Sequence, residues 1–199
     1  MILARTAAPS GVGSHGAPWL TAAIVASWIG AAAVGVIRAV GASPAERGPG
    51  AVLSSLTLAI VLATPAVVAE IARRSRTPAL SIAAGIALVP LGLISVATFP
   101  MLVPAAVFVV AGVRMRGRSG AAAVPASCAV VVTTVAALVV MFVHQDPRSV
   151  ETPTMGSAVS DVVTPVESLA ALLLVAVTIA VAVLAGLSRP GRSADAPGG

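Results

Sequence analysis

The stretch TFPMLVP (residues 98–104) lies inside a 34-residue apolar run from Ala79 to Gly112. As one helix, that run would be about 50 Å long, whereas the hydrocarbon core of a bilayer is about 30 Å thick. A single straight span would need a tilt beyond the usual range of about 0–40°. The choice between one crossing and a turn near this stretch decides which side of a membrane every later loop faces.

The composition is that of an integral membrane protein. The chain has 199 residues, of which 58% are hydrophobic and 10% charged, and its mean hydropathy is +1.04. A soluble domain carries about 25% charged residues, so this chain has too little polar surface to face water on all sides. All 12 basic residues are arginine and the spans are rich in alanine and valine, a bias typical of GC-rich bacteria. We therefore expect a multi-pass protein of a bacterial inner (plasma) membrane.

Four other apolar runs are long enough to cross a bilayer, because a spanning helix needs about 20 residues. They cover residues 18–40, 51–72, 121–143 and 166–187. The disputed run is divided by proline. Pro100 and Pro104 lack an amide donor, Phe99 is disfavoured in helical geometry because it precedes Pro100, and Thr98 is suited to cap a new helix. The spans predicted here are 79–97 and 100–113, the second short enough to be re-entrant.

The arginine positions test this division independently. With six spans and a cytoplasmic N-terminus, nine arginines fall on the cytoplasmic side and three outside, as the positive-inside rule requires. If 79–112 crossed only once, the best split would be seven to five. The expected fold is an all-α polytopic bundle of six transmembrane helices (five if 79–112 crosses once) with both termini cytoplasmic. One transmembrane domain, 18–188, should lie between disordered cytoplasmic tails at 1–17 and 189–199.

Threonine–proline pairs predict local features of the spans. Thr164-Pro165 followed by Glu167 has the pattern of a capping box with proline at the first helical position. Thr77-Pro78 should open the third span in a similar way. Thr64-Pro65 lies inside the second span, where the proline should kink the helix and the threonine should partly satisfy the carbonyl groups that the proline frees.

Small residues are the expected means of packing, because lipid provides no hydrophobic drive for helix association. The first span has a small residue at every fourth position: Ala23, Ser27, Ala31, Gly35 and Ala39. We expect this small-residue face to bind a membrane-protein partner or a second copy, although alanine is abundant enough for such a stripe to arise by chance. The other expected partner is the lipid bilayer. Nucleic acid is not expected, because the arginines lie at the ends of apolar runs without interleaved aromatic residues.

The spans are nearly free of ionisable groups. Apart from Glu167 at the very start of 166–187, Glu70 is the only acidic residue inside one, and it lies one turn from Arg73 and Arg74. An i,i+4 ion pair with Arg74 at the inner interface is the simpler interpretation, and a gate or substrate contact is the alternative. Cys128 lies in an apolar run and is expected to be a small buried packing residue.

Hydroxyl groups inside the spans do not indicate a serine protease. Such an enzyme needs a base, and both histidines, His15 and His144, lie outside the spans. Serine and threonine in membrane helices usually bond to their own backbone. No catalytic or cofactor-binding residue is predicted.

No binding site is predicted in the longest polar loop, 144–167. His144 and Asp146, with Glu151 or Asp161, are a conceivable ligand set for a divalent metal. The loop has no second histidine, cysteine pair or known zinc motif, so a solvated loop is the preferred interpretation and no metal site is predicted.

The expected function is therefore binding without catalysis, as an accessory subunit of a membrane complex or as a homo-oligomeric membrane component. The alternative is a small transporter or channel for a neutral or apolar solute, in which helices broken by proline line a path. Its signature would be hydroxyl groups that converge in one cavity, from Thr64, Ser95 and Thr98.

Overall fold

The computed structural model describes residues 18–41, 49–94, 98–115, 122–143, 146–151, 157–162 and 164–188. These residues form, in chain order, α1 (Pro18–Gly41), α2 (Pro49–Ser75), α3 (Pro78–Leu93), the 3-10 turn η1 (Phe99–Met101), α4 (Leu102–Arg114), α5 (Ala123–Val143), β1 (Asp146–Glu151), β2 (Ser157–Val162) and α6 (Pro165–Leu187). Four helices are long and apolar enough to cross a membrane, over Pro18–Val40, Val52–Ser75, Ala123–Met141 and Pro165–Leu187. The predicted tails at 1–17 and 189–199 lie outside the described residues.

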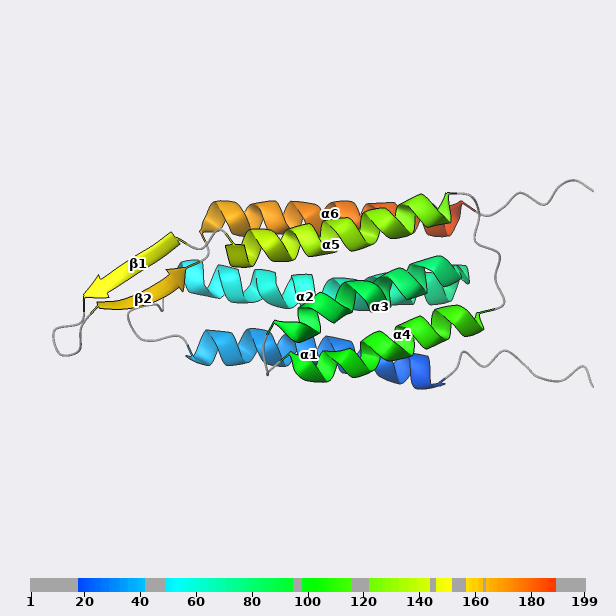
Figure 1. Ribbon diagram of the computed structural model, residues 1–199, viewed down its shortest axis with the longest axis horizontal. Helices are drawn as coiled ribbons and strands as arrows, with labels where there is room; N and C mark the ends of the chain where they lie inside the picture. The colour runs from blue at the N-terminus through cyan, green and yellow to red at the C-terminus, as the bar shows by residue number, and fades with distance from the viewer. Residues whose placement is uncertain are drawn as a thin grey trace, which may run out of the picture.

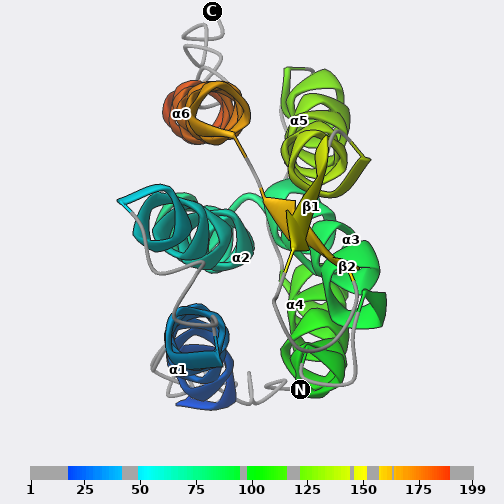
Figure 2. The same ribbon diagram turned by 90° about the vertical axis from the view of Figure 1, so that its left-hand side faces the viewer.

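The helices lie in two layers. Figure 2 shows α1, α2 and α6 side by side in one layer and α4, α3 and α5 in the other. Consecutive helices run in opposite directions, so the start of α1 and the end of α6 lie at one end of the bundle and the β-hairpin at the other (Figure 1). The central helix α2 is the most enclosed: 67% of its apolar span is buried, against 33% or less in the other long helices.

The disputed apolar run forms a helical hairpin. α3 and α4 lie antiparallel, with η1 at the start of the return (Figure 1). Their backbones approach closely at two glycines: a Cβ at Gly85 would lie 2.7 Å from the Ala105 carbonyl oxygen, and one at Gly112 would lie 2.8 Å from the Pro78 carbonyl oxygen. Only residues without a side chain permit such an approach. The run is not one helix, and the predicted turn near TFPMLVP is confirmed.

The two helices of the α3–α4 hairpin are shorter than the other helices. α3 has 16 residues and α4 has 13, which corresponds to lengths of about 24 and 20 Å. In Figure 1 the end of α3 and the start of α4 do not reach as far towards the β-hairpin as the neighbouring ends of α1, α2, α5 and α6. Neither helix is among the four that are long enough to cross a membrane by themselves.

Thr164 and Thr98 were both expected to cap the start of a helix, and only Thr164 does so. At α6, the Thr164 hydroxyl accepts from the Glu167 amide at 3.3 Å and the Glu167 carboxylate accepts from the Thr164 amide at 2.7 Å, which confirms the predicted capping box. The prediction that the Thr98 side chain caps the returning helix is wrong. Its hydroxyl is directed to the Gly92 carbonyl oxygen at 3.5 Å. Its backbone carbonyl instead accepts from the Met101 amide and closes the 3-10 turn.

The connection from α2 to α3 is a tight turn with an arginine at its centre. Arg76 has a φ of 54°, and the Thr77 amide donates to the Ala72 carbonyl oxygen at 3.1 Å. These are the left-handed residue and the long hydrogen bond of a Schellman motif, where glycine is the usual residue. α3 then begins at Pro78 as predicted, although the Thr77 hydroxyl contacts Ser75 Oγ at 2.9 Å and does not cap the helix.

Most of the small-residue face of α1 packs inside the chain, whereas Ala39 at its end is exposed. Ala23, Ser27, Ala31 and Gly35 are all buried, and a Cβ at Gly35 would lie 2.9 Å from a side-chain atom of Ala59 in α2. α2 of the same chain therefore lies against this face at Gly35. The binding of a partner or a second copy to the face stays a prediction.

Candidate functional site

Buried hydroxyl groups mostly bond to their own helix, as predicted. Thr57 and Thr134 each donate to the carbonyl oxygen four residues earlier, at 2.8 and 2.7 Å. Thr64 does the same at 2.9 Å, to Ile60. Pro65 deprives the Val61 carbonyl of its amide donor, so Thr64 serves the neighbouring carbonyl and not the freed one, contrary to our expectation. α2 nevertheless continues through Pro65 as one helix.

Among the described residues, hydroxyls of α3 and of α5 bond to neighbouring helices, and neither pairing was predicted. Ser81 in α3 donates to the Phe108 carbonyl oxygen in α4 at 2.8 Å. The hydroxyls of Thr133 in α5 and Thr178 in α6 lie 2.6 Å apart. The sequence marks all three hydroxyls as lying inside apolar runs, but it contains no signal for which helices become neighbours. Both contacts hold antiparallel helix pairs together.

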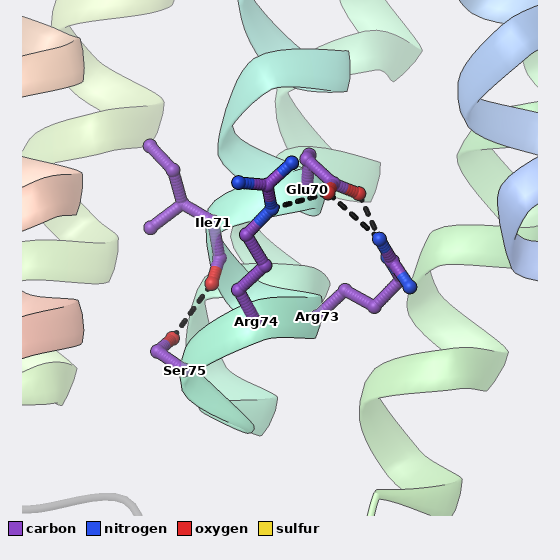
Figure 3. Close-up of polar contacts among 5 residues, drawn as sticks. All are labelled: Glu70, Ile71, Arg73, Arg74 and Ser75. Atoms are coloured by element: carbon purple, nitrogen blue, oxygen red, sulfur yellow. Dashed lines mark hydrogen bonds and ion pairs between the residues drawn. The ribbon is translucent and has the colours of Figure 1, made fainter. Parts of the chain in front are cut away.

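The charged cluster at the end of α2 confirms the predicted Glu70–Arg74 ion pair and adds Arg73. Arg74 Nε donates to Glu70 Oε1 at 2.6 Å. Arg73 donates through Nε and Nη2 to the two carboxylate oxygens, at 2.7 and 2.8 Å. The two guanidinium groups reach the carboxylate from different sides (Figure 3). This double pairing uses both carboxylate oxygens, so Glu70 is held by its own helix.

Arg73 and Arg74 differ in exposure and in the number of N–H donors that they use on Glu70. Arg73 has a 35% exposed side chain and uses two of its nitrogen atoms on Glu70. Arg74 has a 76% exposed side chain and uses only Nε. A guanidinium has five N–H donors, and the four on the terminal nitrogens of Arg74 have no hydrogen bond to another described residue. Two cations and one anion leave the cluster with a net positive charge.

Arg74 lies at a groove between the ends of α2 and α6. The groove has a volume of about 470 Å³ and is lined by Ile71, Arg74, Ser75, Val183, Gly186 and Leu187. Gly186 brings the helices together there, since a Cβ on it would lie 3.2 Å from Ile71 Cγ2 and from Ser75 Cβ. Ser75 donates to the Ile71 carbonyl oxygen at 2.8 Å (Figure 3). The groove is therefore apolar along its length, with one guanidinium on its wall.

A second groove lies between α3 and α5. It has a volume of about 450 Å³ and is lined almost entirely by apolar side chains, among them Ile82, Ile86, Val131 and Val132. Cys128 also lines it and is exposed. The prediction that Cys128 is a buried packing residue is therefore wrong. The apolar run around it does not reveal that this helix position faces outward.

The long polar loop contains a β-hairpin that was not predicted. β1 and β2 pair antiparallel, with Asp146 opposite Val162 and Glu151 opposite Ser157. His144 lies outside the described residues, as do the side chains of the acidic residues in the two strands. Ser95, part of the hydroxyl set predicted for a solute path, is also outside them.

Comparison with known proteins assigns no relative. No protein-family model, curated protein or solved structure matches the chain. The function is therefore argued from the two grooves, the charged cluster and the arrangement of the helices.

Proposed function

We propose that this is a multi-pass membrane protein with cytoplasmic termini that acts by binding, as a non-enzymatic subunit of a membrane complex or as a homo-oligomer. One observation carries the proposal. The buried polar groups of the described helices are hydroxyls, and most of those with a described bond donate to their own helix backbone, whereas the charged side chains lie at helix ends. Proton- and ion-coupled machines place ionisable groups inside their bundles. The surface of the bundle, and not its interior, is therefore the part left for function.

The distribution of charge supports the proposed orientation. Arg73, Arg74, Arg76 and Arg114 lie at the end of the bundle where α2 and α4 finish, and Arg38 lies at the other end (Figure 1). The acidic residues of the described chain other than Glu70 belong to the β-hairpin or to the start of α6, at the Arg38 end. The positive-inside rule then makes the arginine-rich end cytoplasmic.

The groove between α3 and α5 supports a binding role. A volume of about 450 Å³ is within the range of about 300–1,000 Å³ typical of ligand sites. Its lining is apolar and includes the exposed side chains of Val124 and Val132 in α5. A transmembrane segment of a partner, or the same face of a second copy, would meet Cys128 in this groove.

The single cysteine provides the test of this binding role. Cells that express the protein at native levels are treated with a short bis-maleimide, and products are compared with those of Cys128→Ala. A homo-oligomer gives a dimer of this chain, and an accessory subunit gives one heavier adduct, both absent from the variant. A monomer without adducts, which also remains alone after mild solubilisation, would refute the proposal.

Orientation is tested with single cysteines placed in the Cys128→Ala background. Ser157 lies in β2 and Ser188 is exposed after α6, so an impermeant maleimide on intact cells should label Ser157→Cys and not Ser188→Cys. The reverse pattern would place the termini outside. Phe99 is 60% exposed whereas Thr98 is only 5% exposed, so Phe99→Cys is the probe of the α3–α4 tip. Its labelling would support two full crossings by this hairpin.

A transporter of a neutral or apolar solute is the second candidate, and one observation favours it. α3 and α4 are short helices, with Pro90 inside the first and Pro100 at the turn. Short, proline-interrupted membrane segments are characteristic of transporter sites. Solute flux in liposomes that falls in Thr64→Val, with the half-buried Thr133→Val as a control, would favour transport. Equal flux in both variants would remove this candidate.

A further inference from the structure

We propose that the groove between the ends of α2 and α6 binds one anionic phospholipid of the cytoplasmic leaflet, whose phosphate is held by Arg74. An acyl chain would lie along Ile71, Val183 and Leu187, which line the groove. The volume of about 470 Å³ lies within the usual range of ligand sites, about 300–1,000 Å³, and would hold the phosphate and part of one acyl chain while the rest of the lipid stays in the bilayer.

The first argument is charge complementarity. Arg74 is paired with Glu70 through Nε alone, and its terminal nitrogens carry four N–H donors that bond to no other described residue. Arg73 compensates the same carboxylate. The cluster therefore keeps a net positive charge after its internal pairing. A phosphate accepts two parallel bonds from a guanidinium, so the free side of Arg74 matches such a headgroup.

The second argument is the pre-organisation of Arg74. The 2.6 Å bond from Nε to Glu70 fixes the guanidinium, and Glu70 is fixed in turn by Arg73. A phosphate then binds an arginine that has already lost much of its rotational freedom, so less entropy is lost on binding. In Figure 3 the guanidinium of Arg74 lies on the side of Glu70 nearer to Ile71, a residue that lines the groove.

The third argument is location. Basic pockets between helices on the cytoplasmic side are where anionic lipid headgroups bind, and this groove is at the arginine-rich end of the bundle (Figure 1). Free phosphate is not the preferred occupant, because a hydrated ion would contact the guanidinium and leave most of the apolar lining uncovered. A phospholipid covers both the guanidinium and the apolar wall.

The test is lipid binding to the purified full chain. Protein in a mild neutral detergent is titrated with phosphatidylglycerol, phosphatidylcholine or inorganic phosphate, and bound lipid is counted by native mass spectrometry. We expect one tightly bound phosphatidylglycerol, weaker phosphatidylcholine, and loss of about fivefold in phosphatidylglycerol affinity in Arg74→Gln. Arg114→Gln is the matched control: it removes the same charge at the same end of the bundle but does not line the groove.

Steric blocking is a second arm. Gly186→Leu should fill the groove and abolish retained phosphatidylglycerol, whereas Ala39→Leu, at an exposed position of α1 that does not line the groove, should not. If Gly186→Leu does not fold, the two arginine variants decide alone. Equal losses in Arg74→Gln and Arg114→Gln, equal affinity for the two lipids, or displacement by inorganic phosphate would each overturn the proposal.

Discussion

Replacing Gly85 with alanine should push α3 and α4 apart. A Cβ at this position would lie 2.6 Å from Val109 Cγ2, 2.7 Å from the Ala105 carbonyl oxygen and 3.0 Å from the Val109 amide nitrogen. Two of these neighbours are backbone atoms, which cannot rotate away. Ordinary contact begins at 3.4 Å, so relief at the Ala105 oxygen requires a separation of about 0.7 Å, the difference between 3.4 and 2.7 Å.

The magnitude follows from three terms. Overpacking of this kind costs about 1–3 kcal/mol. The separation also weakens the 2.8 Å bond from Ser81 to the Phe108 carbonyl oxygen one turn away, and such bonds in membranes contribute about 0.6 kcal/mol. The higher helix propensity of alanine returns up to about 1 kcal/mol. We therefore expect the free energy of unfolding to fall by about 1–2.5 kcal/mol.

Gly30 provides the matched control in α1. A Cβ there would lie 3.1 Å from Met101 Cε and 3.8 Å from its Cγ, and the end of a methionine side chain moves easily. Gly30→Ala should therefore leave stability unchanged or raise it by up to about 1 kcal/mol. Both variants are unfolded with dodecyl sulfate in mixed micelles and followed by far-ultraviolet circular dichroism. If Gly85→Ala is as stable as Gly30→Ala, the close α3–α4 contact does not exist.

Three further substitutions are read out in the same unfolding assay. Thr164→Ala removes the acceptor of the Glu167 amide and should lower stability by about 1 kcal/mol; no change would mean that the capping box does not hold α6. Arg76→Gly relieves the φ of 54° and should raise stability by up to about 1 kcal/mol, whereas a loss would show that the arginine side chain stabilises the turn. Ser27→Ala removes a buried hydroxyl without a partner and should raise stability by about 1 kcal/mol. A destabilised Ser27→Ala would reveal a bond that this structure does not contain.

The positions of the helices could be predicted because a lipid environment allows few alternatives. Every backbone polar group in the hydrocarbon must be satisfied within the segment, so an apolar run of sufficient length has to be helical. The predicted 18–40 and 166–187 became Pro18–Gly41 and Pro165–Leu187. At Thr164 and Glu167 the capping mechanism was also predictable, since all of its atoms lie within four residues of sequence, whereas the side chains of Thr77 and Thr98 bond elsewhere and cap no helix.

The neighbours of each helix could not be predicted, because contact in lipid depends on matching shapes across the bundle. The stripe containing Ser27 and Gly35 indicated close packing correctly, but the partner is α2 of the same chain. In a chain so rich in alanine, several faces offer the same smooth surface. The outward position of Cys128 was missed for the same reason: an apolar residue and its neighbours look alike whether they face lipid or another helix.

The turn at TFPMLVP has a consequence for orientation that does not depend on how far the hairpin penetrates. α3 and α4 start and finish at the arginine-rich end of the bundle (Figure 1), so the chain returns to that end whether the tip reaches the opposite surface or stops inside. The nine-to-three division of arginines is therefore identical for a full double crossing and for a re-entrant hairpin, whereas a single crossing would give seven to five. The two possibilities differ in the length that they require, since α3 and α4 are about 24 and 20 Å long against a core of about 30 Å. A full crossing requires the bilayer to thin around this layer, and Phe99→Cys labelling measures whether it does.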